Sequence, residues 1–406
     1  MKNLFRFFIT NFKEVSFGWL LTFLSSFGQT FLLSVYVPEI INTFNFTEGT
    51  FGAIYAGCTV TASFIMLSVG HHVDHTSVKR VAGLTVLALA CSNFILSFTN
   101  HILLLIIAII GLRLSGQGLL SHISLTIISK YYSKDRGKAL SIAALGYSVG
   151  EALLPVLVSL VIVWYNWRIG AIITGVGLLL YLIKLKFTDL NHFNEQLSQK
   201  NNPSALKLIK EYKNLIFEKK FLIIMPASFT MIMIITTIFF YQYVFVADKG
   251  WSPTLYAAFF TGYAVARFVF SIVGGIWVDK YTAKKLFKIF LIPITIGLLI
   301  FAFSEDIIGA LFFLLLSGIS IGISGPIRTA VLAEVYGTES LGAIRSLFSM
   351  FTVISSALGP LIVGYLLDLN IPFTHIMLSL FVLMVITTLN TFRIKYVKPM
   401  DRAQGL

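Results

Sequence analysis

The chain of 406 residues is 57% hydrophobic and only 12% charged, and it carries a formal net charge of +13. Soluble domains contain about 25% charged residues, so this composition excludes a set of compact soluble domains and predicts that lipid covers much of the surface. The apolar stretches are about 20 residues long and do not alternate in polarity, which predicts membrane-spanning helices rather than barrel strands.

Twelve apolar stretches predict twelve transmembrane helices. Six of them precede a polar stretch in the middle of the chain, at residues 17–40, 50–72, 81–98, 102–129, 139–164 and 169–183. Six follow it, at residues 221–246, 255–278, 286–303, 307–332, 341–367 and 373–392. We therefore expect an all-α membrane protein with two pseudo-symmetric six-helix bundles, at 1–187 and 221–406, joined by a cytoplasmic central loop at 188–220.

The positions of the basic residues predict the orientation. Of the 31 Lys and Arg residues, 26 fall in the two termini and in alternate loops, and 2 fall in the other loops. The remaining 3, Arg113, Arg267 and Arg328, lie within helices. Because positively charged loops stay in the cytoplasm, both termini are predicted to be cytoplasmic, in a plasma membrane of the bacterial inner-membrane type. The same distribution explains the net charge without a nucleic-acid partner.

An internal repeat relates the two halves. The segments GHHVDHTSVKR, from position 70, and GIWVDKYTAKK, from position 275, share a Gly, a Val, an Asp and a basic pair at a constant offset of 205 positions. The same offset relates three further pairs: Gly137 and Gly342, Tyr131 and Tyr336, and Pro155 and Pro360. One register across so many positions indicates two parallel six-helix halves.

These motifs resemble those of the major facilitator superfamily of secondary transporters. The loop signature after helix two, its repeat after helix eight, and the segments RLSGQG (113–118) and DRGKAL (135–140) carry the resemblance. It implies alternating access around a central site and a cytoplasmic latch that gates transport. The gating residues would then be Gly70, Asp74, Lys79, Arg80, Gly275, Asp279, Lys284 and Lys285.

Buried charges are the candidates for solute binding. Arg113 and Arg267 lie in the middle of helices four and eight, where each costs about 2.5–3.5 kcal/mol on an insertion scale, so each requires a partner or a water-filled cavity. Residue counting places Glu151 at a similar depth to Arg113. We expect the two to pair, with Glu151 acting either as the proton-coupling carboxylate or as a static counter-ion.

The segment around Arg267 resembles helix eight of monocarboxylate and oxalate/formate carriers, although Tyr263 replaces the acid usual there. Together these observations give a predicted substrate-binding set of Arg113, Arg267, Gln29 and Tyr263.

Three classes of function remain open. The buried arginines favour a secondary transporter of a small carboxylate-type anion, proton-linked or exchanging. The alternative is a proton-driven exporter of drug-like or other hydrophobic compounds. A receptor, enzyme or scaffold is disfavoured, because the sequence has no nucleotide-binding loop, no metal-ligand spacing and no nucleophile–base set. We expect no enzymatic activity, cofactor or metal, and a monomer whose partners are the small-molecule substrate, membrane lipid and protons.

Overall fold

The computed structural model describes residues 7–69, 76–132, 136–196, 215–336 and 341–396. The chain divides into two compact units. Unit 1 comprises Met1–Lys200 together with Phe239–Ala247, and unit 2 comprises Asn201–Ile238 together with Asp248–Leu406. The helix α12 (Lys219–Asp248) therefore contributes to both units.

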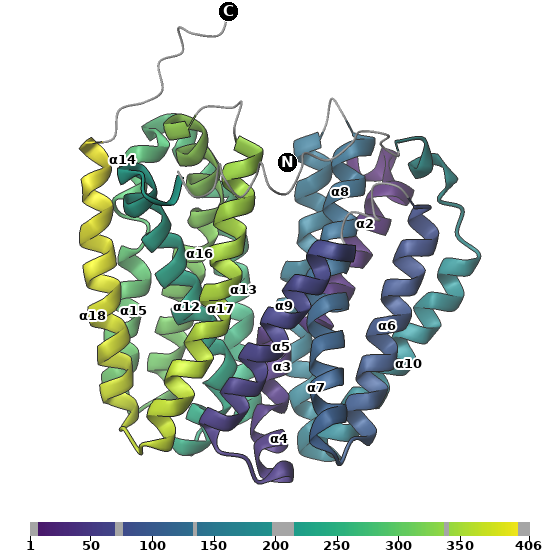
Figure 1. Cartoon of the computed structure of the whole chain (residues 1–406), viewed down its shortest axis with the longest axis horizontal. Helices are drawn as coiled ribbons and strands as arrows, with labels where there is room; N and C mark the ends of the chain where they lie inside the picture. The colour runs from purple at the N-terminus through teal and green to yellow at the C-terminus, as the bar shows by residue number, and fades with distance from the viewer. Residues whose placement is uncertain (1–6, 70–75, 133–135, 197–214, 337–340, 397–406) are drawn as a thin grey trace, which may run out of the picture. The chain divides into compact units, whose positions relative to one another are not determined.

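Unit 1 is built from helices alone in the part of the chain that the structure describes (Figure 1). Short 3₁₀ turns connect or follow some of the helices, at η1 (Ser26–Gly28), η2 (Ser34–Tyr36) and η5 (Asn191–Gln196). The helices and one π-helical segment, η4, are α2 (Phe12–Ser25), α3 (Thr30–Leu33), α4 (Val37–Phe44), α5 (Glu48–Val69), α6 (Val78–Phe98), α7 (Ile102–Gly111), η4 (Leu112–Leu120), α8 (Ser121–Tyr131), α9 (Arg136–Trp164) and α10 (Trp167–Lys186).

The described part of unit 2 is also helical. Besides α12 its elements are α13 (Pro253–Tyr281), α14 (Ala283–Phe287), α15 (Ile292–Phe303), α16 (Ile307–Tyr336), α17 (Leu341–Asp368), α18 (Phe373–Thr391) and the 3₁₀ turn η6 (Phe392–Tyr396). The helices α13 and α16 pack along each other, as do α15 and α18.

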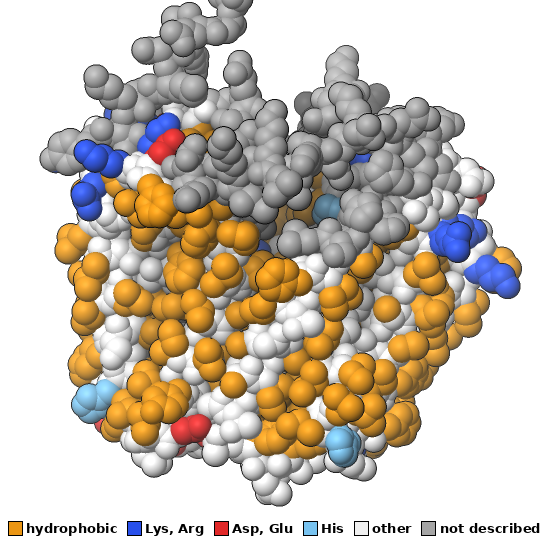
Figure 2. All heavy atoms as spheres, in the orientation of Figure 1, with side chains coloured by type: hydrophobic (Ala, Val, Ile, Leu, Met, Phe, Trp, Pro, Cys, Tyr) orange, Lys and Arg blue, Asp and Glu red, His pale blue; other side chains and the backbone are white. Residues whose placement is uncertain are grey.

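The described helices confirm a polytopic membrane protein. Eleven are long and apolar enough to cross a membrane, and the bent pair Phe12–Gly28 and Thr30–Phe44 raises the number to twelve if it counts as one span. Hydrophobic side chains cover the visible flanks of the helices, and Lys and Arg side chains lie near one end of each unit (Figure 2). An apolar flank with charged ends is what a lipid environment requires.

The 205-residue repeat also governs the helix boundaries. Four helices of unit 1 begin 205 positions before their counterparts in unit 2: Glu48 and Pro253, Val78 and Ala283, Ile102 and Ile307, and Arg136 and Leu341. The helices α8 and α16 end at the matched tyrosines Tyr131 and Tyr336. The motif register therefore reflects a shared six-helix architecture.

The first helix differs from the prediction. Residues 17–40 were expected to form one continuous helix, but the chain bends by 45° between the pair of helices on either side of Gln29. The Gln29 backbone is extended, with φ −81° and ψ 153°, so the helical hydrogen-bond ladder is interrupted there. Its counterpart α12 runs from Lys219 to Asp248 without a break.

Candidate functional site

The break in the first helix lies directly on the π-helical segment of the fourth. A Cβ added to Gly28 would lie 2.7 Å from Gly116 Cα and 2.9 Å from Gln117 N, and closer still to the carbonyl oxygen of Leu112. All three are backbone atoms, so only glycine allows the two chains to approach this closely. The π segment is another departure from regular α-helix, and such segments are frequent at functional sites.

Arg113 lies in the π segment and reaches this break. Its side chain is only 3% exposed. Nη1 donates hydrogen bonds to the Gly28 carbonyl oxygen at 3.2 Å and to Thr30 Oγ1 at 3.1 Å. The guanidinium carbon lies 5.0 Å from the centre of the Tyr55 ring, a cation–π contact. The other two guanidinium nitrogens, Nε and Nη2, are buried and have no hydrogen-bond partner among the described residues.

The unpartnered nitrogens form one edge of the guanidinium. The N–H groups of Nε and Nη2 point the same way within a rigid plane. In this arrangement they can donate one hydrogen bond to each oxygen of a carboxylate. We call this edge the Arg113 fork. A buried donor without a partner carries a desolvation cost of about 1–3 kcal/mol, and more when it is charged. The fork is therefore suited to a ligand that brings its own acceptor pair.

The remaining predicted residues of unit 1 surround this region. Gln29 is buried and occupies the break itself, next to the carbonyl that Arg113 binds. Glu151 is 1% exposed and lies in α9 immediately after Gly150, which faces Ser26 of the first helix. The expected pairing with Glu151 is not among the hydrogen bonds of the Arg113 guanidinium and otherwise stays a prediction. Within the described residues, its hydrogen bonds go to neutral groups only.

In unit 2 the predicted residues lie where α13 crosses α16. Added Cβ atoms on Gly318 and Gly322 of α16 would come within 2.5 Å of the carbonyl oxygens of Tyr263 and Arg267. Tyr263 is 1% exposed and Arg267 is half-buried. The charge of Arg328, further along α16, interacts electrostatically with that of Arg267. Unit 2 thus holds two cations near one helix crossing.

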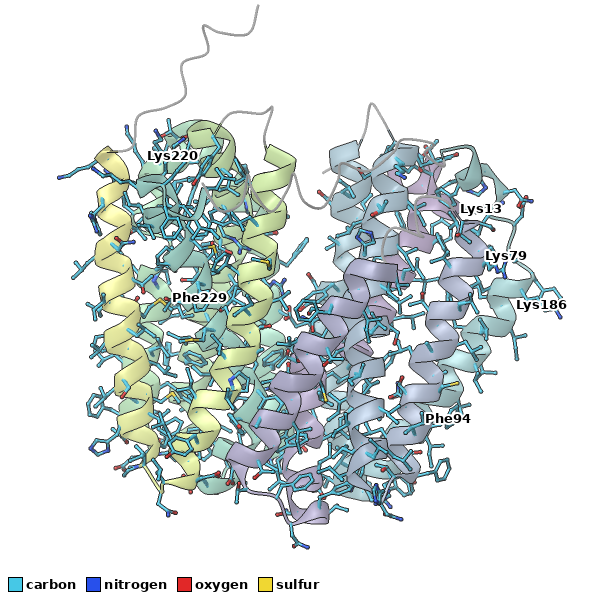
Figure 3. All side chains as sticks on the ribbon, in the orientation of Figure 1. Lys13, Lys79, Phe94, Lys186, Lys220 and Phe229 are labelled. Atoms are coloured by element: carbon cyan, nitrogen blue, oxygen red, sulfur yellow. The ribbon has the colours of Figure 1, made fainter. Side chains whose placement is uncertain are left out.

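The structure describes only part of the predicted latch. Gly70 and Asp74 lie outside the described residues, as does the side chain of Asp279. Lys79 Nζ donates to the Lys186 carbonyl oxygen at 2.6 Å, and Figure 3 shows the two residues side by side.

The other basic residues of the signature are accessible to solvent. Arg80 and Lys285 are exposed, and Lys284 is half-buried. Nothing lies within 4 Å of a Cβ added to Gly275. A different acid, Glu334, accepts a hydrogen bond from Ala283 N at the start of α14, at 3.2 Å. The gating role of the signature remains a prediction.

Sequence reasoning missed Thr30 and Tyr55. Thr30 Oγ1 and Tyr55 Oη are hydrogen-bonded at 2.7 Å, so the tyrosine holds the same hydroxyl that Arg113 contacts. The only local signal was the run SFGQT at 26–30, in which small and polar residues interrupt an apolar stretch.

Eleven or twelve membrane spans in the described residues, arranged as two repeated halves, form the architecture of a membrane carrier of small solutes. The chain belongs to the Major Facilitator Superfamily, whose family model matches residues 18–260 and 243–404. It is a multi-pass secondary transporter.

Similar proteins include several kinds of carrier. The chain is 26% identical over 133 residues to a multidrug resistance protein B homolog of Mycobacterium tuberculosis. The aligned residues cover 33% of this chain and 25% of that protein. It is 25% identical over 295 residues to monocarboxylate transporter 13 of Bos taurus, covering 71% of this chain and 66% of the other. The crystal structure of a bacterial homolog of the human lysosomal transporter Spinster has the same fold, with a TM-score of 0.78 over 96% of this chain and 98% of that one, at 13% identity.

Proposed function

We propose that this protein carries a small carboxylate-type anion across the membrane, by exchange or together with a proton. The observation that carries the proposal is the Arg113 fork, two adjacent N–H groups that are buried and have no hydrogen-bond partner in the part of the chain that the structure describes. Charge-assisted hydrogen bonds of this kind are about twice as strong as neutral ones, and the paired geometry selects a planar two-oxygen group.

The hydrogen-bond partners of Arg113 are neutral groups, which supports an anionic ligand. Its hydrogen bonds go to a backbone carbonyl and a hydroxyl, and its ring contact is to Tyr55. None of these groups cancels the positive charge, whereas a bound carboxylate would. Because the fork is buried in this conformation, the anion reaches it only when the surrounding helices move, as alternating access requires.

The pseudo-symmetry argues that Arg113 serves the solute rather than the fold. The repeat places Gly318 at the position that corresponds to Arg113, and Gly318 packs against the backbone of α13. The first helix is broken where its counterpart α12 is continuous. Since unit 2 forms the same architecture without either feature, both are specific to the chemistry of unit 1.

Four further residues are proposed to take part in transport, two in each unit. Gln29, at the break, offers an amide that can hydrogen-bond the polar end of a substrate, and Arg267 with Tyr263 offers a cation and a hydroxyl in unit 2. Glu151, 1% exposed in α9, is the proposed proton-carrying group. A carboxyl at such depth can bind and release a proton as its access to water alternates between the two sides.

The similarity to monocarboxylate transporter 13 agrees with a carboxylate substrate, and it extends over 71% of this chain. The alternative, proton-driven export of hydrophobic compounds, has the similarity to the multidrug resistance protein B homolog, over 33% of this chain, in its favour. A hydrophobic compound would leave the two N–H groups of the Arg113 fork without acceptors, so the structure favours the anion.

Uptake into proteoliposomes tests the proposal. Radiolabelled pyruvate, lactate and oxalate serve as probes, with wild type, Arg113→Lys, Arg113→Gln and Arg267→Gln. Arg113→Lys keeps the charge but loses the fork, so we expect KM to rise about tenfold, since one lost charge-assisted hydrogen bond is worth roughly 1.5–3 kcal/mol. Arg113→Gln should raise it further.

The matched control is Arg393→Gln, which removes the same charge from an exposed residue. It should leave uptake unchanged. If both Arg113 variants transported the probes like wild type, or if the protein moved only neutral or cationic dyes in an efflux assay, the anion proposal would be wrong.

A further inference from the structure

The Arg113 fork is connected to a second group of buried side chains through Tyr55. The Tyr55 ring lies under the Arg113 guanidinium, and its hydroxyl is hydrogen-bonded to Thr30 Oγ1. The same Thr30 oxygen accepts a hydrogen bond from Arg113 Nη1. The other contact of the ring is Phe240, whose centroid lies 4.2 Å away. Tyr55 and Phe240 are both fully buried, with 0% exposure. One tyrosine therefore touches both the cation and an aromatic side chain of α12.

Phe240 belongs to the outer segment of α12, residues Phe239–Ala247, which is part of unit 1. Two polar contacts follow it along the helix. Tyr241 Oη donates to the Glu48 carbonyl oxygen at 2.8 Å, and Gln242 Nε2 donates to Ser34 Oγ at 2.7 Å. A further ring contact joins Phe240 to Phe51 at 5.6 Å. The segment is thus held by three consecutive buried side chains, of which the first, Phe240, packs on Tyr55.

We propose that Tyr55 is a positioning residue that ties the Arg113 fork to the outer segment of α12, so that neutralising the fork loosens that segment. This inference rests on the proposed anion site, but its core, the link from Arg113 through Tyr55 to Phe240, stands without any substrate. Tyr55 itself need not touch the transported molecule.

The physical reason is electrostatic. A guanidinium attracts the face of an aromatic ring in proportion to its charge, and this attraction is strongest where water is excluded. An anion bound at Nε and Nη2 offsets that charge, which weakens the hold of Arg113 on the Tyr55 ring. The ring then gains freedom to shift, and the aromatic contact with Phe240, which depends on ring placement, weakens with it. The outer segment of α12 then loses Phe240, the first of its three anchors.

Hydrogen–deuterium exchange of the full-length protein in lipid nanodiscs measures how often the backbone hydrogen bonds of residues 239–247 open. The variants are Arg113→Gln, Tyr55→Phe, Tyr55→Leu and the double variant Arg113→Gln with Tyr55→Leu. Arg113→Gln removes the positive charge without any ligand, so the measurement does not depend on knowing the substrate. The control is Phe313→Leu, which removes one ring from a buried stacked pair, Phe301 and Phe313 at 4.7 Å, in unit 2.

We expect Arg113→Gln and Tyr55→Leu each to speed exchange in residues 239–247 roughly three- to tenfold, the change in local opening that loss of one aromatic or cation–π contact predicts. Tyr55→Phe keeps the ring and should stay within about twofold of wild type, a rescue that separates ring contact from general loss of packing. The double variant should exchange no faster than Tyr55→Leu alone, because both changes cut the same link. Phe313→Leu should leave this segment unchanged.

Unchanged exchange at residues 239–247 in Arg113→Gln would overturn the inference, as would equal and additive effects of Arg113→Gln and Tyr55→Leu. If Tyr55→Leu does not fold, Arg113→Gln and Tyr55→Phe still decide the result. Failure of the anion uptake assay, with faster exchange in Arg113→Gln, would refute the proposed substrate and leave the link intact. Anion uptake as proposed, with unchanged exchange in Arg113→Gln, would refute the link through Tyr55 and leave the proposed substrate intact.

Discussion

Replacing Gly28 with alanine should damage both stability and solute binding. The added methyl group would lie 2.7 Å from Gly116 Cα and closer still to the Leu112 carbonyl oxygen. Because an ordinary contact begins at 3.4 Å, the two chains must separate by at least 0.7 Å. The neighbouring atoms are backbone and cannot rotate away. The Arg113 Nη1 to Gly28 carbonyl hydrogen bond is 3.2 Å long, and the same separation along it would give 3.9 Å, beyond a hydrogen bond.

The expected cost of this substitution is about 1–3 kcal/mol, the usual range for overpacking a tight site. Thermal unfolding in detergent and the KM for anion uptake are the two measurements, and KM should rise at least about tenfold because the fork is no longer held in place. Gly57→Ala is the matched control. Nothing lies within 4 Å of its added Cβ, so it should stabilise α5 slightly, by about 0.5–1 kcal/mol. A Gly28→Ala protein with wild-type melting temperature and KM would refute the close crossing.

Three further predictions concern other parts of the chain. Glu151→Gln should abolish dependence of uptake on the proton gradient while sparing counterflow exchange, and acid-driven uptake equal to wild type would exclude Glu151 as the proton carrier. Asp74→Asn should lower the turnover number much more than the affinity if the loop signature is a latch, so the reverse split between kcat and KM would argue against gating. Arg168→Ala should lower the melting temperature, because Arg168 donates at 2.7, 2.8 and 2.7 Å to Ser97, Thr99 and Asn100; Arg80→Ala, at an exposed position, should not.

The sequence predicted the fold because the length of the apolar stretches and the internal repeat can be read directly from the chain, without knowing its tertiary contacts. A stretch of about 20 apolar residues must cross the bilayer whatever it packs against, and the spans of the structure follow those stretches. The offset of 205 positions, read from the motifs after helices two and eight, reappears in the helix starts Glu48 and Pro253. Neither inference required knowledge of which helix faces touch.

The details of the site could not be predicted in the same way, because they depend on local departures from helix geometry. Pairing Arg113 with Glu151 assumed two straight helices with 1.5 Å rise per residue. Arg113 lies in the π segment at Leu112–Leu120, and the break at Gln29 places the Gly28 carbonyl oxygen within hydrogen-bond distance of it. Hydropathy does not distinguish a broken helix from a continuous one, so the sequence could not predict the Gly28 carbonyl as a hydrogen-bond partner of Arg113.

The comparison of the two halves explains why one fold can serve many solutes. Close helix crossings recur in both units: Gly146 of α9 meets the backbone of α2, and Gly359 of α17 meets that of α12. Such crossings need only a small residue at the point of contact and carry no information about a solute. The cation, in contrast, occurs once in the matched pair, as Arg113 opposite Gly318. A buried charge is destabilising unless a ligand or a partner offsets it. Because only one of the two matched positions carries such a charge, the substrate should be sought at the Arg113 fork.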